Sequence, residues 1–210
     1  MFDQLSMFDA QPAGESSATP AVSAGAAGPP DLLHSFFFAV VLNESAAAHV
    51  HAQAARLDRV LAVGGRALEA ERLHVSLLAV GACVGALPEA GIARWRRAAD
   101  TVRCAPFDVR FDRAATFGGD GNPLVLKSSD DAGVAGLLSL YQAVGMSLAD
   151  TGERIKPRRI TPHMTLSYRG RRIAETPIEP VCWQACDLVL IDSHVGAHRH
   201  ELLGRWPLRR

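Results

Sequence analysis

The chain has 210 residues, of which 48% are hydrophobic and 21% are charged. This suits one globular domain or two small lobes that share a core. Basic and acidic residues number 22 each, so the net charge is zero, which excludes a strongly basic nucleic-acid coat protein.

The cysteines give no sign of an oxidising environment. None of the four, Cys83, Cys104, Cys182 and Cys186, forms a C-x-x-C pair, and no secretory leader precedes them. We therefore expect reduced thiols and a cytoplasmic location. No apolar run reaches the length needed to cross a bilayer, so no membrane association is expected.

Residues 1–30 are expected to form a disordered tail, followed by a folded domain over 31–210. The stretch 9–30 is rich in Ala, Gly, Ser and Pro and lacks aromatic residues. Such a segment cannot bury enough apolar surface to offset its ordering entropy. Within the tail, QLSMF (4–8) resembles the short peptide by which many bacterial proteins bind the DNA-polymerase sliding clamp. The alternative is an apolar patch without function.

The folded region alternates between strand and helix patterns. The apolar runs predict strands at 35–42, 72–81, 106–118, 123–128, 186–195 and 200–208, and a further strand in the stretch 162–170. Helical spacing predicts helices over about 45–61, 88–102 and 130–149, the last capped by Asp130 and Asp131. The cluster GGDGN (118–122) predicts a hairpin between two of the strands. Hairpins argue against a purely parallel sheet and favour an α+β fold with antiparallel sheets.

Two strands carry the same short motif. LHVSLL (73–78) contains His74 and Ser76, and PHMTLSYRG (162–170) contains His163 and Thr165, 89 residues later. A chain of this composition is expected to hold roughly 0.1 chance matches to H-x-[ST]-L, so two matches indicate a repeat. In a strand, residues i and i+2 project from one face, so each strand offers an imidazole beside a hydroxyl. One such histidine alone would more often be an ordinary packed residue.

Paired imidazoles and hydroxyls suit phosphodiester cleavage. A neutral imidazole can take a proton from a nucleophile while an opposed imidazolium protonates the leaving oxygen. The hydroxyls of Ser76 and Thr165 can donate hydrogen bonds to non-bridging phosphate oxygens, where charge builds in the transition state. This chemistry requires neither a metal nor a cofactor. The residues alone do not decide which histidine is the acid.

The paired H-V-S-L and H-M-T-L resemble the H-x-[ST]-x signatures of the two-histidine phosphoesterase superfamily, and within it the bacterial RNA 2′,3′-cyclic phosphodiesterases, also called 2′-5′ RNA ligases. The aromatic strand FFFAVVL and the terminal W-P-L add to the resemblance, which covers about residues 35–208. It implies a bilobal fold, with two pseudo-symmetric antiparallel sheets and outer helices around a central cleft. It also implies hydrolysis of RNA 2′,3′-cyclic phosphates to 2′-phosphates, with ligation as the reverse reaction. In that scheme His74 protonates the leaving 3′ oxygen, His163 activates water, and Ser76 and Thr165 hold the phosphate.

Other residues and substrates stay open at this point. Tyr168, Arg169 and Phe38 are candidate substrate contacts, although a surface role at the strand end is equally good for Tyr168 and Arg169. The basic residues around the second motif, from Arg154 to Arg172, face either phosphate or solvent. The alternative substrates are small cyclic nucleotides or 2′-5′ linked oligonucleotides. A non-catalytic RNA-binding module is the alternative from another class.

A second histidine group lies near the end of the chain. His194, His198 and His200 occur in SHVGAHRHEL, where Gly196 and Ala197 suggest a turn between two strands. A zinc site needs three or four convergent ligands, whereas hairpin histidines are usually solvated. We therefore expect these three side chains to be exposed, no metal to be bound, and the protein to be a monomer.

Overall fold

The fold is described from a computed structural model over residues 32–118, 122–154 and 158–210. The expected disordered tail and the clamp-like peptide at 4–8 lie outside these residues, as does most of the turn cluster GGDGN. Both tail assignments stay predictions.

The first part of the chain forms strands and helices close to the expected positions. Its elements are β1 (Leu33–Val41), α1 (Glu44–Leu61), β2 (Arg66–Ala67), the 3-10 turn η2 (Ala70–Arg72), β3 (His74–Val84) and α2 (Glu89–Thr101). The start of α1 is fixed by Asn43, whose side-chain oxygen accepts a hydrogen bond from the Ala46 backbone N–H at 2.8 Å. Asn43 is therefore the N-cap of α1.

The rest of the chain adds the expected hairpin and one strand that was not expected. Its elements are β4 (Phe107–Thr116), β5 (Leu124–Lys127), the 3-10 turn η3 (Ala132–Val134), α3 (Ala135–Asp150), β6 (His163–Tyr168), β7 (Thr176–Ala185), β8 (Asp187–His194) and β9 (Arg199–Pro207). β4 and β5 pair antiparallel, as the hairpin signal predicted. Asp130 accepts a hydrogen bond from the Gly133 N–H at 3.0 Å, so it caps η3 rather than α3 itself, and Asp131 makes no side-chain cap.

All nine strands form one antiparallel sheet that falls into two halves. The strand order is β7-β4-β5-β6-β3-β1-β8-β9, and β2 pairs with β6. The halves meet where β3 and β6 share a single residue pair, Val75 with Met164. Each inner strand ends a β–α–β unit, β1–α1–β3 in one half and β5–α3–β6 in the other. The expected α+β class and antiparallel pairing are confirmed.

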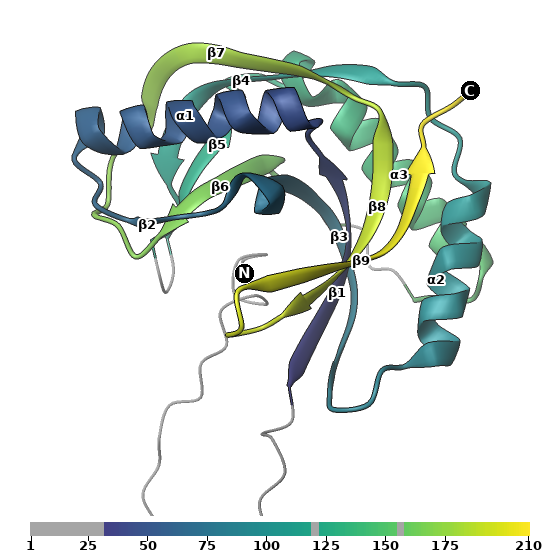
Figure 1. Ribbon diagram of the computed structural model, residues 1–210. Helices are drawn as coiled ribbons and strands as arrows, with labels where there is room; N and C mark the ends of the chain where they lie inside the picture. Colours follow the sequence, from purple (N-terminus) through teal and green to yellow (C-terminus); the bar gives the residue numbers. More distant parts are fainter. Residues whose placement is uncertain (1–31, 119–121, 155–157) are drawn as a thin grey trace, which may run out of the picture.

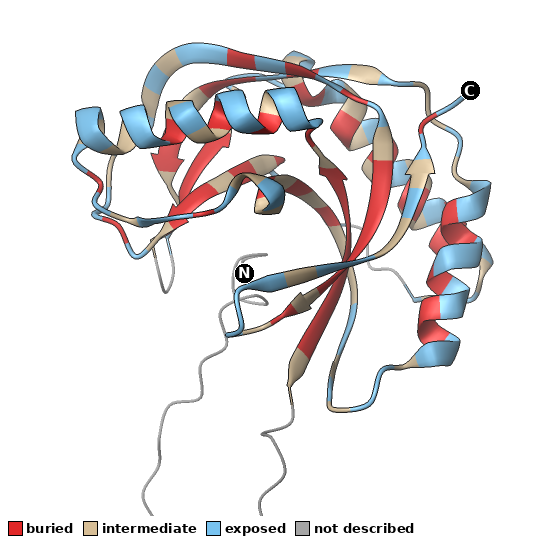
Figure 2. Ribbon diagram, viewed as in Figure 1, coloured by how far each residue is buried: buried red, intermediate tan, exposed pale blue. Residues whose placement is uncertain are grey.

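The helices cover one face of this sheet and leave the other for the site. α1 lies over the β4, β5 and β6 half, whereas α2 and α3 pack on one another and against strands of the other half (Figure 1). The side chains of Val75 and Met164 are fully buried in the resulting core. In Figure 2 the buried stretches run along β1 and β8 and on one side of α2. Phe36 of β1 meets Trp95 of α2 there, with 5.3 Å between ring centroids.

The segment Ala132–Asp150 bears on the expectation that no run of the chain could cross a bilayer. Its 19 residues are long and apolar enough to count as a candidate membrane span by length and composition alone. The core helix of a globular fold passes the same test. In this structure the α3 side chains of Leu137, Leu140 and Leu148 are completely buried in the core.

Candidate active site

His74 is the first residue of β3, and its ring is held by the chain immediately before it. Its Nδ1–H donates to the Arg72 carbonyl at 2.7 Å. Its Nε2 then faces the Ser76 hydroxyl at 3.1 Å. With Nδ1 protonated, Nε2 carries the lone pair and accepts from Ser76. The i, i+2 arrangement expected from the motif is therefore present.

His163 begins β6 and repeats this local arrangement. Its Nδ1–H donates to the carbonyl of Thr161, again two residues upstream, at 2.8 Å. The ring of Phe117 packs edge-on against it, with 4.8 Å between centroids. Thr165 lies two residues further along the strand and is half-buried, as Ser76 is. Both histidines are thus oriented through Nδ1, which leaves Nε2 as the nitrogen for proton transfer.

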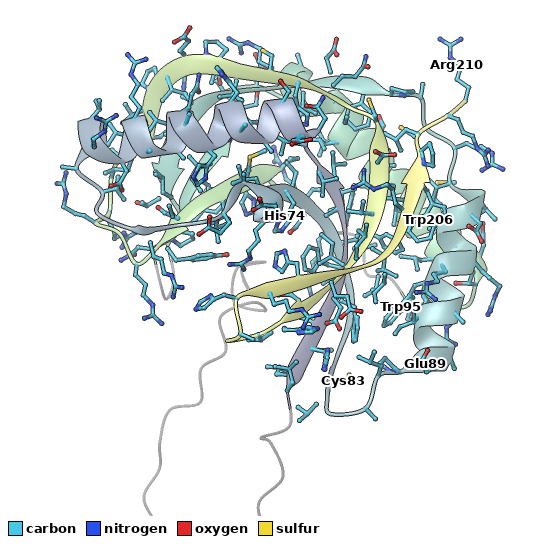
Figure 3. The ribbon with its side chains drawn as sticks, viewed as in Figure 1. His74, Cys83, Glu89, Trp95, Trp206 and Arg210 are labelled. Carbon is cyan, nitrogen blue, oxygen red and sulfur yellow. The ribbon has the colours of Figure 1, made fainter. Side chains whose placement is uncertain are left out.

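The register between β3 and β6 brings the two motifs together. Val75 pairs with Met164, and both side chains enter the core. In an antiparallel pair this places His74 across from Thr165 and Ser76 across from His163, all four on the opposite face. Figure 3 shows His74 where the two halves of the sheet meet. Each histidine therefore has a hydroxyl on its own strand and another on the neighbouring strand.

An aromatic group surrounds His74 on the side of the β1 half. Phe37 lies 5.2 Å from it and His200 of β9 also lies 5.2 Å from it, measured between ring centroids. Phe37 belongs to a small apolar cluster with Ala39 and Val189 on this face. The expectation that the hairpin histidines are exposed is therefore wrong for His200, which is partly buried, and for His194, which is buried, and holds for His198.

Phe38 is not a substrate contact. Its side chain is 0% exposed and belongs to the core on the helix-covered face, where its ring lies 6.3 Å from that of Trp206. Successive strand residues point to opposite faces, so Phe37 occupies the site face and Phe38 the core face. Because the run FFFAVV is apolar throughout, the sequence did not indicate which of its residues face the site and which face the core.

Burial disfavours the protonated forms of His74 and His200. Desolvation is the main cause that lowers the pKa of His74 to about 4, and a positive charge on His163 lowers it further. Desolvation also lowers the pKa of His200 to about 3, with contributions from the charges of His74 and Arg72. His74 is therefore neutral near pH 7 in the unliganded protein.

These depressed pKa values predict acid sensitivity. The unfolded chain binds protons at His74 and His200 below about pH 6.5, whereas the folded chain does so only near pH 4 and pH 3. The free energy of unfolding should therefore fall as pH drops from about 6.5 to 4, with a slope of at most ~1.4 kcal/mol per pH unit for each group. His200→Phe keeps an aromatic ring beside Phe37 and removes one titrating group. Urea unfolding between pH 7 and pH 4 should give a shallower decline for this variant, and parallel declines would contradict the pKa of His200.

A basic rim, formed by Arg66, Arg72, Arg169 and His198, lies beside the histidine pair. Arg66 donates from Nη1 to His198 Nε2 at 3.1 Å. Desolvation lowers the pKa of His198, and the charges of all three arginines lower it further. Arg72 is partly buried, so that desolvation lowers its pKa, and its Nε makes no hydrogen bond within the described residues. Arg169 is exposed and has a left-handed backbone, with φ of 61°. The rim gathers positive charge beside His74 and His200.

Tyr168 and Arg169 therefore both lie at the edge of the site. The charge of Tyr168 raises the pKa of Arg72, and Tyr168 pairs with Arg66 in the sheet. Arg171, by contrast, is used at the end of a helix. Its guanidinium donates to the carbonyls of Leu61 and Ala62 at the C-terminal end of α1. Arg169 thus belongs to the rim, whereas Arg171 caps α1.

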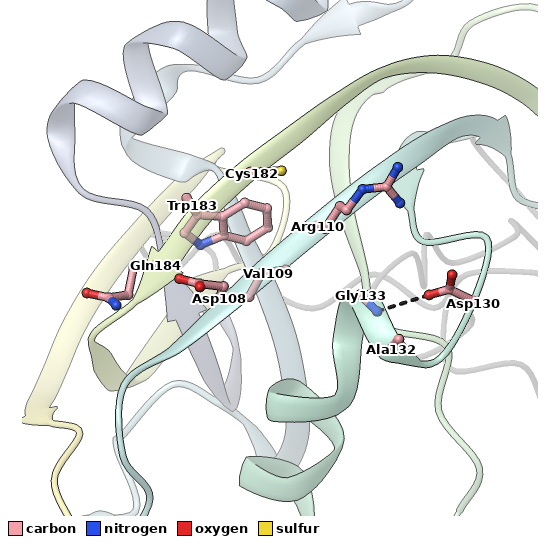
Figure 4. Close-up of a pocket in the computed structure, with 9 residues that line it drawn as sticks. All are labelled: Asp108, Val109, Arg110, Asp130, Ala132, Gly133, Cys182, Trp183 and Gln184. Carbon is pink, nitrogen blue, oxygen red and sulfur yellow. Dashed lines mark hydrogen bonds between the residues drawn. The ribbon is translucent and has the colours of Figure 1, made fainter.

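A surface hollow lies elsewhere on the described part of the chain. It is lined by residues of β4, β7 and the η3 turn, among them Arg110, Asp130 and Trp183 (Figure 4). None of the motif residues or rim residues lines it. It carries no pair of opposed proton-transfer groups and is not assigned to the reaction.

Comparison with known families fits this geometry. The model of the 2′-5′ RNA ligase superfamily matches residues 43–197, a span that includes both motifs. The chain belongs to this superfamily. The resemblance to two-histidine phosphoesterases seen in the sequence is thereby confirmed. A comparison with curated proteins finds no match.

Solved structures of the superfamily share the fold. Escherichia coli LigT in complex with 3′-AMP superposes with a TM-score of 0.65 at 22% identity, covering 87% of this chain and 100% of LigT. LigT in its apo form gives a TM-score of 0.64, also at 22% identity and with the same coverage of both chains. TT0787 of Thermus thermophilus gives a TM-score of 0.63 at 19% identity, covering 83% of this chain and 98% of its own. At these identities the likeness establishes the fold and leaves the substrate to the site itself.

Proposed function

We propose that the protein hydrolyses 2′,3′-cyclic phosphates at RNA ends to 2′-phosphates. The single observation that carries the proposal is the pairing of the two motifs across β3 and β6, which sets His74, Ser76, His163 and Thr165 on one face. Two imidazoles oriented through Nδ1 supply an acid and a base. Two hydroxyls supply donors for the phosphate.

The reaction follows from these four groups. Nε2 of His163 takes a proton from water, whose oxygen attacks phosphorus. The bond from phosphorus to O3′ breaks, and Nε2–H of His74 donates its proton to O3′, which leaves a 3′-hydroxyl and a 2′-phosphate monoester. The hydroxyls of Ser76 and Thr165 donate to the non-bridging oxygens as negative charge builds there. Exchange with solvent then returns both imidazoles to their starting states.

The basic rim favours an RNA end over a small nucleotide. Arg66, Arg72 and Arg169 add positive charge around His198, beside the histidine pair, and further phosphates of an RNA chain would be attracted to it. LigT has been crystallised with 3′-AMP, with phosphate, with ATP and with NADP+, so a superfamily member of this fold accepts mononucleotides and dinucleotides as ligands. Small cyclic nucleotides and 2′-5′ linked oligonucleotides are therefore the second candidates. A purely binding module would need no opposed imidazole pair.

A substrate panel tests the assignment. An oligoribonucleotide with a 2′,3′-cyclic phosphate, a 2′,3′-cyclic mononucleotide and a 2′-5′ linked dinucleotide should be compared by kcat/KM in buffer with EDTA. We expect turnover of the oligonucleotide, release of the 2′-phosphate isomer only, and a lower kcat/KM for the mononucleotide. Tight binding without turnover would overturn the enzymatic assignment, and a 3′-phosphate product would overturn the roles of the histidines.

The acid role of His74 makes a specific prediction about pH. His74 has a pKa of about 4 in the free protein, so it must gain a proton when the anionic phosphate binds. The affinity for a monoanionic, non-hydrolysable phosphodiester analogue should therefore rise as pH falls from 7 to 4, by up to tenfold per pH unit. His74→Gln should flatten this dependence. Calorimetric titration of both proteins checks it, and a flat profile in the native chain would assign the base role to His74 instead.

A further inference from the structure

A second group of titratable side chains lies on the face of the sheet opposite the active site. It consists of His34 of β1 with Asp192 and His194 of β8, named here the His-Asp-His cluster. His34 and His194 are direct cross-strand partners, and Asp192 is two residues before His194. His34 also stacks on Phe36, which belongs to the helix-covered core. The cluster therefore lies at the rim of the core beneath α2.

The cluster is far from the reaction. The partner of His74 on β1 is Val41, seven residues beyond His34, which corresponds to about 23 Å along the strand. The cross-strand partner of His34 on β3 is Cys83. Figure 3 shows Cys83 well separated from His74. No step of the proposed hydrolysis uses these residues.

The side-chain nitrogen and oxygen atoms of the His-Asp-His cluster lie close to one another. His34 Nδ1 lies 2.7 Å from Asp192 Oδ2, and His194 Nε2 lies 3.4 Å from the same oxygen. One nitrogen or oxygen from each of the three residues lies within 4.8 Å of those from the others. The His34 and His194 rings meet edge to face at 5.0 Å between centroids. Bonds of 2.0–2.2 Å in a tetrahedral zinc site place ligand atoms roughly 3.3 Å apart, so these atoms need move little.

The cluster is buried and incompletely satisfied. Asp192 is 1% exposed, His34 8% and His194 9%. Asp192 Oδ1 and His194 Nε2 are buried, and neither makes a hydrogen bond within the described residues. A buried carboxylate with one hydrogen bond is costly, as is a buried imidazole nitrogen with none. A cation bound between them would satisfy both atoms.

Two further potential metal ligands, Cys83 and Glu201, lie beside the His-Asp-His cluster. Cys83 of β3 is the cross-strand partner of His34, and the pKa of its thiol is raised first by burial and then by the charge of Asp192. The carboxylate of Glu201 lies 3.7 Å from His194 Nε2 and is half exposed, so it marks the solvent side of the cluster. Imidazole, carboxylate and thiolate are the ligand types that zinc takes in proteins.

We propose that His34, Asp192 and His194 bind a divalent transition-metal cation of the Zn²⁺ class as a structural site. The cation would link β1 to β8 at the end of the sheet where the folded domain begins. It neutralises the buried carboxylate of Asp192 and uses the lone pair that His194 Nε2 leaves unbonded. A water, Glu201 or Cys83 completes the fourth position. Because the site is remote from His74, it contributes to stability and not to the chemical step.

Zinc binding to the full chain tests this directly. Protein dialysed against EDTA and freed of the chelator should take up one equivalent of Zn²⁺ at pH 7.5 in competition with a chromophoric chelator. Losing outer-sphere partners of a metal ligand typically costs 10–100-fold in affinity, so Asp192→Asn and His194→Gln should each lower the affinity by at least about 100-fold. Zn²⁺ should also raise the Tm of the native chain in a saturable way and leave the Tm of both variants unchanged.

Matched controls locate the cation. His198→Gln removes an exposed histidine from the same hairpin, and His74→Gln removes one from the active site, so both should keep the tight site. Far-UV circular dichroism establishes that each variant is folded. Co²⁺ substitution gives intense visible bands for a four-coordinate site, and a sulfur charge-transfer band only if Cys83 is a ligand.

Two results would overturn the proposal. One is a native chain that takes up no Zn²⁺, which would mean that an ion pair between His34 and Asp192 alone satisfies the cluster. The other is equal uptake by the Asp192→Asn and native chains. Hydrolysis by Asp192→Asn at 25 °C should equal that of the native chain, so this result is separate from the fate of the proposed activity.

Discussion

Replacing His74 or His163 with alanine is expected to lower kcat for cyclic-phosphate hydrolysis by about 10²–10⁴-fold in each case, the usual contribution of a positioned acid or base. Each imidazole is fixed through Nδ1 to a backbone carbonyl, so the alanine variant removes an Nε2 that is held in a defined position. The double variant should lose little more than either single variant, because the two transfers serve one displacement. Single-turnover kinetics on the cyclic-phosphate oligonucleotide measures the loss.

The control for these variants is His49→Ala. His49 is an exposed histidine on α1, and its replacement should leave kcat unchanged. Retention of more than about a tenth of the native kcat by either catalytic variant would contradict the assignment, given the size expected of such a group.

A large loss of kcat is also expected when the hydroxyl of Ser76 or of Thr165 is removed. Thr165→Val keeps the size and branching of the side chain and removes its donor, and Ser76→Ala removes the other donor. Loss of one hydrogen bond to a developing oxyanion typically costs 10²–10³-fold in kcat. We expect each variant to show such a loss with a smaller change in KM. Measured kcat and KM at pH 7 separate the two effects.

Conservative replacements should behave differently at these positions. Thr165→Ser and Ser76→Thr keep the hydroxyl donor, because each exchanges one hydroxyl residue for the other. Both should remain within about tenfold of the native kcat, because a methyl group changes packing but not the hydrogen bond. If Ser76→Ala were as active as Ser76→Thr, the phosphate would not be held by this hydroxyl.

Local patterns predicted most of the fold. The strands at β1, β3, β8 and β9 and the helices α1, α2 and α3 lie within a few residues of their expected positions. β7 was missed because Pro177 and Pro180 interrupt its pattern. The structure resolves the conflict by placing β7 at the edge of the sheet, where a strand has one unpaired side and proline is tolerated.

Of the candidate site, only the residues of the repeated motif could be predicted from the sequence. The spacing of His74 and Ser76, matched by His163 and Thr165, indicated which residues share a face, and the register of β3 and β6 agrees. The burial of His194 depends on the pairing of β8 with β1, which lie more than 150 residues apart in the chain, and the β8–β9 hairpin then sets His200 beside Phe37 and His74. No local pattern carries that information. The same holds for Phe37 and Phe38, since an unbroken apolar run lacks the alternation that would assign each residue to a face.

The single backbone pair between β3 and β6 has a consequence for the width of the catalytic gap. In a continuous ladder, side chains across from one another have Cβ atoms about 4.5–5.5 Å apart, too close to admit a phosphoryl group between them. Here the ladder stops after Val75 and Met164, so the strands can splay on either side of that pair. The seam joins the two halves of the sheet, each of which carries one histidine. The spacing of the two imidazoles is therefore not fixed by a ladder of backbone hydrogen bonds and depends on how far β3 and β6 separate beyond this one pair.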